Sequence, residues 1–99
     1  MIYDLSEKNF AENIKNGAKL IEFYASWCPY CREEDLVLNA MDNIWVGKVN
    51  SDNNSKLVAD YQIMGYPTFL LFKDGVERAR FSGYHTKKEI EDIVSSYIK

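Results

Sequence analysis

Cysteine, proline and histidine are scarce in this chain: its 99 residues include two cysteines, two prolines and one histidine. A zinc site needs about four suitable ligands, and beyond the cysteine pair the chain offers only the distant His85. A haem-attachment motif needs a histidine directly after the second cysteine, but Arg32 stands there. We therefore expect neither a metal site nor a haem.

Long apolar runs and clusters of positive charge are missing too. No apolar segment approaches the roughly 20 residues of a membrane-spanning helix, and the opening MIYDLSEKNF lacks the basic and apolar regions of a secretory signal. A net charge of −3 without a basic stripe argues against a nucleic-acid partner. We expect a protein that binds no membrane and, if no leader was removed, stays in the cytoplasm, where lasting disulfides are rare.

The composition that remains is that of an ordinary globular protein. Hydrophobic residues make up 46% of the chain and charged residues 27%, which excludes disordered and low-complexity classes. A chain of this length can build one modest core. No linker, repeat or charge block divides it, so we predict a single domain over residues 1–99.

The hydrophobic pattern predicts alternating strands and helices. We expect strands at residues 2–5, 19–25, 45–50, 68–73 and 76–82, and helices at 7–16, at 29–43, within 53–61 and after residue 86. The run at 19–25 is almost entirely apolar, β-branched or aromatic, which is typical of a strand buried on both faces of a sheet. The order β-α-β-α-β-α-β-β-α predicts an α/β fold.

Local signals mark both ends of the first helix and the apolar side of the second. Ser6 is expected to be the N-cap of the first helix, with Leu5 and Phe10 spaced as a hydrophobic staple. Gly17 then provides the stop. In the helix over 29–43 we expect four apolar residues on one side: Leu36, Ala40, Met41 and Ile44.

The last third of the chain carries two further signals. Asp74 and Gly75 predict a hairpin turn between two strands, because both residues tolerate positive φ. Thr86 and Glu89 have the spacing of a capping box. Apolar residues then recur at helical intervals, so a final amphipathic helix is expected.

Both cysteines lie in the stretch IEFYASWCPYCREED, residues 21–35. Proline is favoured at the first helical position, so Pro29 places Cys28 at a helix N-cap, with the N–H groups of Tyr30 and Cys31 directed at its sulfur. These donors and the helix dipole favour a thiolate, and such sites lower a cysteine pKa from about 8.5 to roughly 3.5–7.5. Cys31, one turn further on, is expected to be less exposed.

This asymmetry suits thiol–disulfide exchange. The Cys28 thiolate attacks a substrate disulfide, and Cys31 then attacks the mixed disulfide, which frees the reduced substrate and leaves Cys28–Cys31 oxidised. A zinc site, a structural cross-link and inert core thiols are the alternatives. The shortage of ligands and the expected compartment favour dithiol redox chemistry.

With these features in place, the sequence resembles the thioredoxin family over almost its whole length. The resemblance is carried by EFYASWCPYC, GKVNSDNN, IMGYPTFLLFKDG and Gly83. It implies the thioredoxin fold, a central mixed β-sheet flanked by helices. It also implies a protein-disulfide reductase that takes part in electron transport and cell redox homeostasis and needs no cofactor beyond the redox-active Cys28–Cys31 pair.

The resemblance further implies a substrate-binding surface around the cysteines. Pro67 should be in the cis form and face the cysteine pair, and the backbone of Tyr66 should offer hydrogen bonds to an extended substrate. The residues implied in binding are Trp27, Pro29, Tyr30, Tyr66, Pro67, Gly83 and Tyr84, and Met64 could extend the patch. An exposed apolar patch would let many disulfide partners dock. Ordinary packing is the alternative for these side chains, chiefly for Tyr84 and Met64.

Glu22 interrupts the buried strand, and a buried carboxylate is costly unless it is neutralised, paired or hydrated. The resemblance places Glu22 where the family carries a buried acid beneath the cysteines, with Lys48 beside it on the neighbouring strand. Our hypothesis is that desolvation raises the pKa of Glu22 and that its carboxylate takes the proton of Cys31, directly or through a water. A partly exposed, merely stabilising Glu22–Lys48 ion pair is the alternative. His85 is expected at the surface.

The chain departs from the family pattern at the dipeptide between the cysteines. It has Pro-Tyr, the glutaredoxin pattern, where thioredoxins usually have Gly-Pro. Glutathione is therefore an alternative electron donor to a flavin-dependent thioredoxin reductase, and the reduction potential should be less negative than is usual. Against a glutaredoxin, the Thr-Val-Pro loop and the Gly-Gly pair are absent. A binding module with incidental cysteines is the alternative from another class.

Disulfide-containing proteins are the expected substrates, and the protein itself is expected to be a monomer. Glu33, Glu34 and Asp35 crowd the first turns of the helix after the cysteines. They should favour the helix and oppose the Cys28 thiolate slightly. The kink proline that thioredoxins often have near Leu36 is missing, so reductase recognition could differ.

Overall fold

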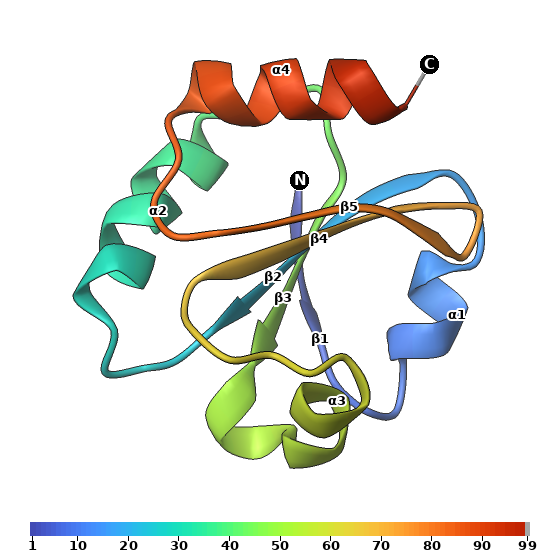
Figure 1. Cartoon of the computed structure of the whole chain (residues 1–99), viewed down its shortest axis with the longest axis vertical. Coiled ribbons are helices and arrows are strands. Elements are labelled where there is room, and N and C mark those ends of the chain that lie inside the picture. The colour runs from blue at the N-terminus through green and yellow to red at the C-terminus, as the bar shows by residue number, and fades with distance from the viewer. Residues whose placement is uncertain (99) are drawn as a thin grey trace.

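The computed structural model describes residues 1–98 of the chain, which form a mixed sheet with helices on both sides (Figure 1). The strands are β1 (Ile2–Leu5), β2 (Ala18–Tyr24), β3 (Val46–Asn50), β4 (Thr68–Lys73) and β5 (Val76–Ser82). The helices are α1 (Phe10–Ile14), α2 (Pro29–Asn39), α3 (Ser55–Asp60) and α4 (Lys87–Tyr97), with a 3₁₀ turn, η1, at Ser51–Asn53. The predicted order of elements is confirmed.

The strands pair in the order β1-β3-β2-β4-β5. β1, β3 and β2 run parallel to one another, whereas β4 is antiparallel to β2 and β5 is antiparallel to β4. The buried β2 thus has one parallel and one antiparallel neighbour. The edges are β1, which has four residues, and β5, most of whose side chains are exposed. The thioredoxin fold expected from the resemblance is confirmed.

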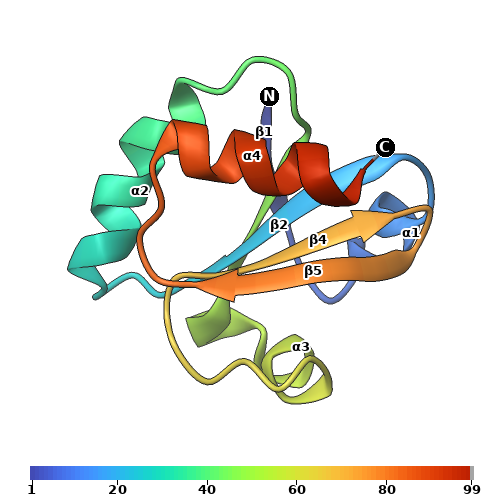
Figure 2. The same ribbon diagram turned by 45° about the horizontal axis from the view of Figure 1, so that its top comes forward.

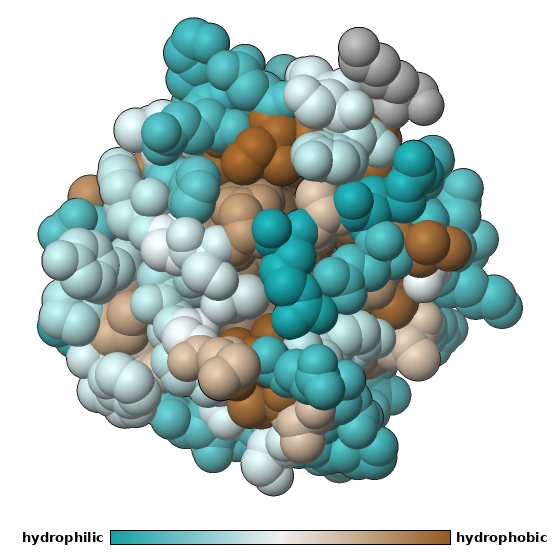
Figure 3. Space-filling model, in the orientation of Figure 1, coloured by the Kyte–Doolittle hydropathy of each residue, from teal (hydrophilic) through white to brown (hydrophobic). Residues whose placement is uncertain are grey.

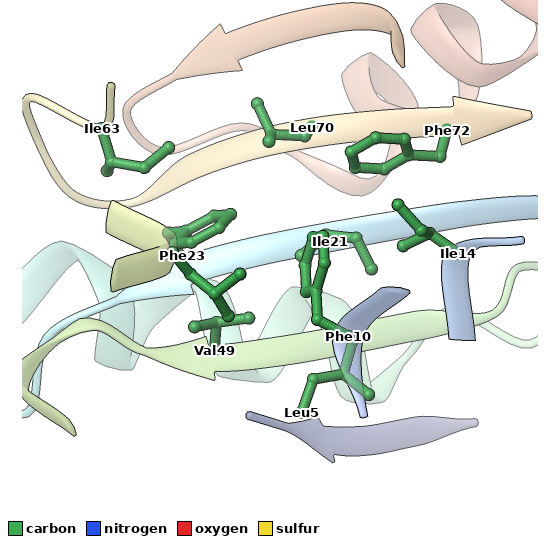
Figure 4. Close-up of a cluster of buried hydrophobic side chains, with 10 residues drawn as sticks. Leu5, Phe10, Ile14, Ile21, Phe23, Val49, Ile63, Leu70 and Phe72 are labelled. Atoms are coloured by element: carbon green, nitrogen blue, oxygen red, sulfur yellow. The ribbon is translucent and has the colours of Figure 1, made fainter. Parts of the chain in front are cut away.

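Two hydrophobic clusters fill the spaces on either side of the sheet. α1 and α3 cover one face, and α2 and α4 cover the other (Figure 2). Figure 4 shows the first cluster, in which Phe10 of α1 packs towards Phe23 and Phe72 of the sheet. Because side chains alternate along a strand, Ile21 and Phe23 point into this cluster, while Leu20 and Glu22 point towards α2 and α4.

The surface seen from the side of Figure 1 mixes polar and apolar residues, and the apolar ones form separate patches rather than one continuous face (Figure 3). Within residues 1–98, no helix has both the length and the apolar character that crossing a membrane requires.

The first helix is shorter than the sequence predicted. It covers Phe10–Ile14 rather than residues 7–16, because a tight turn at residues 7–9 precedes it. Ser6 stabilises this turn instead of the helix: its Oγ accepts the N–H of Lys8 at 3.2 Å, and its own N–H donates to Oδ1 of Asn9 at 2.8 Å. Leu5 and Phe10 do pack in one cluster, as the staple predicted.

The helix after the cysteines also differs from the prediction. It ends at Asn39 rather than at residue 43, and the N–H groups of Ala40 and Met41 bond three residues back, which tightens its last turn. Leu36 is 76% exposed and Ala40 is exposed too, so the expected buried side is wrong for these two residues. The helix instead buries Cys31, Glu34 and Leu38.

The turn and cap predicted for the last third of the chain are confirmed. Asp74 and Gly75 join β4 to β5 with φ values of 51° and 84°. Thr86 accepts the N–H of Glu89, and the Glu89 side chain accepts the N–H of Thr86 at 2.8 Å, which completes the capping box of α4.

Candidate active site

The cysteine pair lies where the central strand β2 meets helix α2. Cys28 is the N-cap of α2, in an extended conformation, and Pro29 is its first helical residue. The Sγ atom of Cys28 accepts the backbone N–H of Cys31 at 3.2 Å. This geometry confirms the N-cap position that Pro29 predicted, although only one of the two expected donors, that of Cys31, is directed at the sulfur.

Exposure does not distinguish the two cysteines, contrary to our expectation. Both are 4% exposed, because Ala25, Tyr24 and Tyr66 pack around them in a small cluster. This covering comes from the β2–α2 connection and from a loop more than thirty residues away along the chain. The sequence around the cysteines therefore could not show it.

The environment of Cys31 nevertheless holds the proton on its sulfur. Burial is the main cause that raises the pKa of the Cys31 thiol, to about 12, and a hydrogen bond with the Cys28 side chain adds to it. The negative charge of Glu22 acts in the same direction, while the backbone of Ala25 opposes the shift. Cys31 is thus a thiol that needs a proton acceptor before it can attack.

A second loop, between α3 and β4, lies against the cysteine pair. The Tyr66–Pro67 peptide bond is cis, as the resemblance implied. Tyr66 packs on the cysteine cluster, and its ring meets that of Trp27 edge to face at 5.9 Å. The carbonyl of Pro67 accepts the N–H of Gly83 at 2.8 Å. Tyr66 thus contacts both the cysteine cluster and Trp27, and Gly83 is hydrogen-bonded to Pro67 of the same loop.

The remaining residues of the expected binding surface are exposed. Trp27, Tyr30, Met64 and Tyr84 are among the large hydrophobic side chains that face solvent, and Pro29 is exposed as well. Their part in binding substrate stays a prediction.

One residue that positions Trp27 was missed by the sequence reasoning. Oδ2 of Asp52 accepts both the N–H and the Oγ–H of Ser26, at 3.2 and 2.8 Å. These hydrogen bonds, together with one from the Trp27 side chain, lower the pKa of Asp52. Asp52 thereby ties the residues directly before the cysteines to η1. The available signal for this contact was the position of Asp52 just after β3, because the ends of the parallel neighbours β2 and β3 lie close together.

Glu22 is completely buried on the face of β2 that points towards α2. Its exposed fraction is 0%, and neither carboxylate oxygen has a hydrogen-bond partner within residues 1–98. Burial raises the pKa of Glu22 to about 8, and the charge of Lys48 opposes that rise. Lys48 is the register partner of Glu22 on β3, as expected, but its Nζ lies 3.9 Å from Oε1. The ion pair that we considered as the alternative is present only as this long contact, and its carboxyl group is buried rather than partly exposed.

Asp35 is the closer partner of Lys48, which the sequence reasoning missed. The Nζ of Lys48 donates a hydrogen bond to Oδ1 of Asp35 on α2. Burial opposes the charge of Lys48, but the bond to Asp35 and the charge of Glu22 outweigh it and raise the pKa of Lys48. The signal was the helical spacing, since residues three and four positions after Cys31 share its face.

Glu34, on α2, is a second buried carboxyl group besides Glu22 on β2. Its exposed fraction is 0%, and its Oε1 accepts the backbone N–H of His85 at 2.8 Å. Burial raises the pKa of Glu34, and His85 opposes the rise. His85 is only partly exposed, because its ring packs against Phe69 and Phe81. The expected surface position of His85 therefore holds only in part.

Metal binding finds no support in this part of the molecule. Among residues 1–98, no three histidine, cysteine, aspartate or glutamate side chains are grouped so as to hold a metal ion. The two thiols are free. The site can reduce a substrate disulfide while its own dithiol becomes a disulfide. The buried carboxyl group of Glu22 is close enough for its charge to act on Cys31.

Comparisons with known proteins agree on one family. The family model described as Thioredoxin matches residues 1–96. A thioredoxin of Chlamydia pneumoniae is 34% identical over 101 residues, and the match covers 98% of this chain and 99% of the relative. One of Chlamydia trachomatis serovar D is 33% identical with the same coverage. The solved structure of a mutant thioredoxin from Halobacterium salinarum NRC-1 matches with a TM-score of 0.86 and 27% identity, over 99% of this chain and 90% of that one.

Proposed function

Because this chain belongs to the thioredoxin family, and is therefore a thiol–disulfide oxidoreductase that reduces protein disulfides through its cysteine pair, we propose the following roles for its residues. Cys28 is the nucleophile, Cys31 is the resolving thiol, and Glu22, with Lys48 beside it, is the proton acceptor. The observation that carries this assignment is the position of the Cys28 sulfur at the N-cap of α2, directly next to a thiol that burial keeps protonated.

In the first step, the Cys28 thiolate attacks one sulfur of the substrate disulfide. A bond forms between that sulfur and Cys28, the substrate disulfide breaks, and the second substrate sulfur leaves as a thiolate that takes a proton from solvent. The N–H of Cys31, 3.2 Å from the Cys28 sulfur, and the amino end of α2 favour the negative charge on the nucleophile.

In the second step, Cys31 gives its proton to Glu22 and attacks the Cys28 sulfur. The mixed disulfide breaks, the remaining substrate sulfur leaves as a thiolate, and Cys28–Cys31 is oxidised as the substrate gains two electrons. Burial raises the pKa of Glu22 to about 8, so this carboxylate is a far stronger base than an ordinary one. Cys31 holds its proton more tightly still, so the transfer has to accompany the attack rather than precede it.

Substrates dock on the apolar surface around Cys28. Trp27 and Tyr30 are exposed beside the cysteine pair in the sequence, and Tyr66, whose ring contacts that of Trp27, packs against the cysteine cluster. Backbone hydrogen bonds to Tyr66 would hold an extended segment with little demand on its sequence. Pro29, Pro67, Gly83 and Tyr84 complete this surface in the proposal.

A cytoplasmic flavin-dependent thioredoxin reductase is the proposed electron donor, with the chain acting as a single monomeric domain in electron transport. The match of the Thioredoxin family model to residues 1–96 supports this donor. The Pro-Tyr dipeptide between the cysteines favours glutathione as a second candidate.

Trapping experiments test the assignment of the cysteines. A Cys31→Ser variant should accumulate mixed disulfides with substrate proteins at Cys28, detected by mass spectrometry, because the resolving thiol is gone. A Cys28→Ser variant is the matched control and should accumulate none. Trapping at Cys31 instead would contradict the assigned roles. Supplying either thioredoxin reductase with NADPH, or glutathione with its reductase, then identifies the donor that sustains turnover of the wild-type protein.

A further inference from the structure

Lys48 lies between two carboxyl groups, one partly exposed and one completely buried. Its Nζ is hydrogen-bonded to Asp35 on α2 and lies 3.9 Å from Oε1 of Glu22 on β2. Asp35 is partly exposed, whereas Glu22 is completely buried and neither of its oxygens has a partner in the described chain. The lysine thus binds the carboxylate that water could stabilise and leaves the buried one without a hydrogen bond.

This choice of partner bears on the chemistry at Glu22. A cation in direct contact with a carboxylate favours its charged form and makes it a weak base. Lys48 would need to move only from 3.9 Å to hydrogen-bonding distance to make that contact. Asp35 opposes the movement because it binds the ammonium group, and its negative charge also raises the pKa of Glu22.

The other groups that face Glu22 do not explain its lack of a partner. From α2, Glu34 and Cys31 approach as further acids, and on β2 Tyr24 is a titratable side chain that interacts with Glu22. On β4 the register partner of Glu22 is the apolar Phe69. Lys48 is therefore the one cation that acts on Glu22 among residues 1–98, and Asp35 decides where it points.

We propose that Asp35 is a positioning residue for the proton transfer: by binding the ammonium group of Lys48, it keeps that cation from forming a hydrogen-bonded ion pair with Glu22 and so preserves the buried carboxyl group as a proton acceptor. Asp35 touches neither the substrate nor the sulfurs in this account. This positioning passes through Lys48 and is separate from the direct effect of the Asp35 charge on Glu22. The inference rests on the proposed role of Glu22 for its consequence in catalysis, but not for the interaction itself.

The interaction is measured by following the side-chain carboxyl carbon of Glu22 by ¹³C NMR as the pH of the reduced protein is changed. In Asp35→Asn the midpoint of the Glu22 titration should fall by about one pH unit or more, because the released cation moves onto the carboxylate. Glu33→Gln removes a negative charge from an exposed position of the same helix. It is the matched control and should leave the midpoint in place. An unchanged midpoint in Asp35→Asn would overturn the proposal.

A double-mutant cycle with Lys48→Met shows whether the effect passes through the lysine. Lys48→Met alone should raise the midpoint, because the only cation that acts on Glu22 in the described chain is lost. Added to Lys48→Met, the Asp35→Asn substitution should shift the midpoint by much less than it does when Lys48 is present. Equal shifts in both backgrounds would overturn the positioning role and leave only a direct charge effect.

The consequence for catalysis is read from the pH dependence of the resolving step, measured by stopped flow as release of the second substrate thiol. The acidic limb of this profile, along which Glu22 becomes protonated, should move to lower pH in Asp35→Asn by the same amount as the NMR midpoint. A midpoint that moves while the rate profile stays would refute Glu22 as the acceptor. The inference that Asp35 directs Lys48 would stand in that case, so the two failures are distinguishable.

Discussion

Replacing Glu22 by glutamine should change how the stability of the protein depends on pH. Burial raises the pKa of Glu22 from its ordinary value of 4.5 to about 8 in the folded protein. The folded state then binds the proton more tightly than the unfolded state. The stabilising contribution of Glu22 is therefore complete below pH 4.5 and is lost as the pH rises through about 8.

The size of the effect follows from the shift. Each pH unit between the two pKa values corresponds to about 1.4 kcal/mol, so a shift from 4.5 to about 8 is worth about 5 kcal/mol over the whole range. Between pH 5 and pH 8 the wild-type protein should lose about 3 to 4 kcal/mol of unfolding free energy relative to Glu22→Gln, whose amide does not titrate.

Urea unfolding of the reduced protein at half-unit steps of pH measures this difference. The free energies of unfolding of wild type and Glu22→Gln should change relative to each other as the pH rises, with the variant becoming the more stable protein at the alkaline end. Glu33→Gln removes a carboxyl group from an exposed position of α2, and its curve should run parallel to that of the wild type. Parallel curves for Glu22→Gln would show that the buried carboxyl group does not keep its proton.

Two further substitutions test the packing and the hydrogen bonds around the site. Gly47→Ala should lower the free energy of unfolding by about 1–3 kcal/mol, because a Cβ there would lie 2.6 Å from Cδ1 of Leu5. Gly65→Ala, whose Cβ would meet nothing within 4 Å, is the control. Equal urea midpoints for the two variants would contradict the expectation. Glu34→Leu should speed hydrogen exchange of the His85 amide, whose acceptor is Oε1 of Glu34. Glu34→Gln keeps an acceptor and should leave the His85 amide protected. The same exchange rate in both variants would exclude that hydrogen bond as the cause of protection.

The order of the elements and the cap of the active-site helix could be predicted because both depend on local rules. Pro29 is suited to the first turn of a helix, which places Cys28 at the N-cap. Asp74 and Gly75 allow the positive φ values that the hairpin needs. In such cases the residues of a short segment contain the whole physical reason.

The burial of the active-site helix could not be predicted in the same way. Hydrophobicity placed Leu36 and Ala40 on its inner side, but the helix buries Glu34 and leaves Leu36 exposed. A buried carboxyl group is tolerated there because His85, from a loop that follows β5, donates a hydrogen bond to it. That partner lies 51 residues away, and no pattern within the helix reveals it.

The contacts of the cysteine pair depend on tertiary structure for the same reason. Tyr66 covers the sulfurs from the loop before β4, so the expected difference in exposure between Cys28 and Cys31 disappears. The sequence showed Asp35 only as one of three acids on the helix, because its contact with Lys48 depends on how α2 packs on the sheet.

The outer strands of the sheet have a bearing on behaviour at high concentration. An unpaired strand edge can recruit the edge of another molecule unless it is short or charged. Here β1 has four residues, and β5 carries Glu77, Arg78 and Arg80, two of which form an ion pair at 3.0 Å. Sheets of neighbouring molecules would have to remove water from these charges before they could pair, which disfavours association of two molecules through their sheet edges.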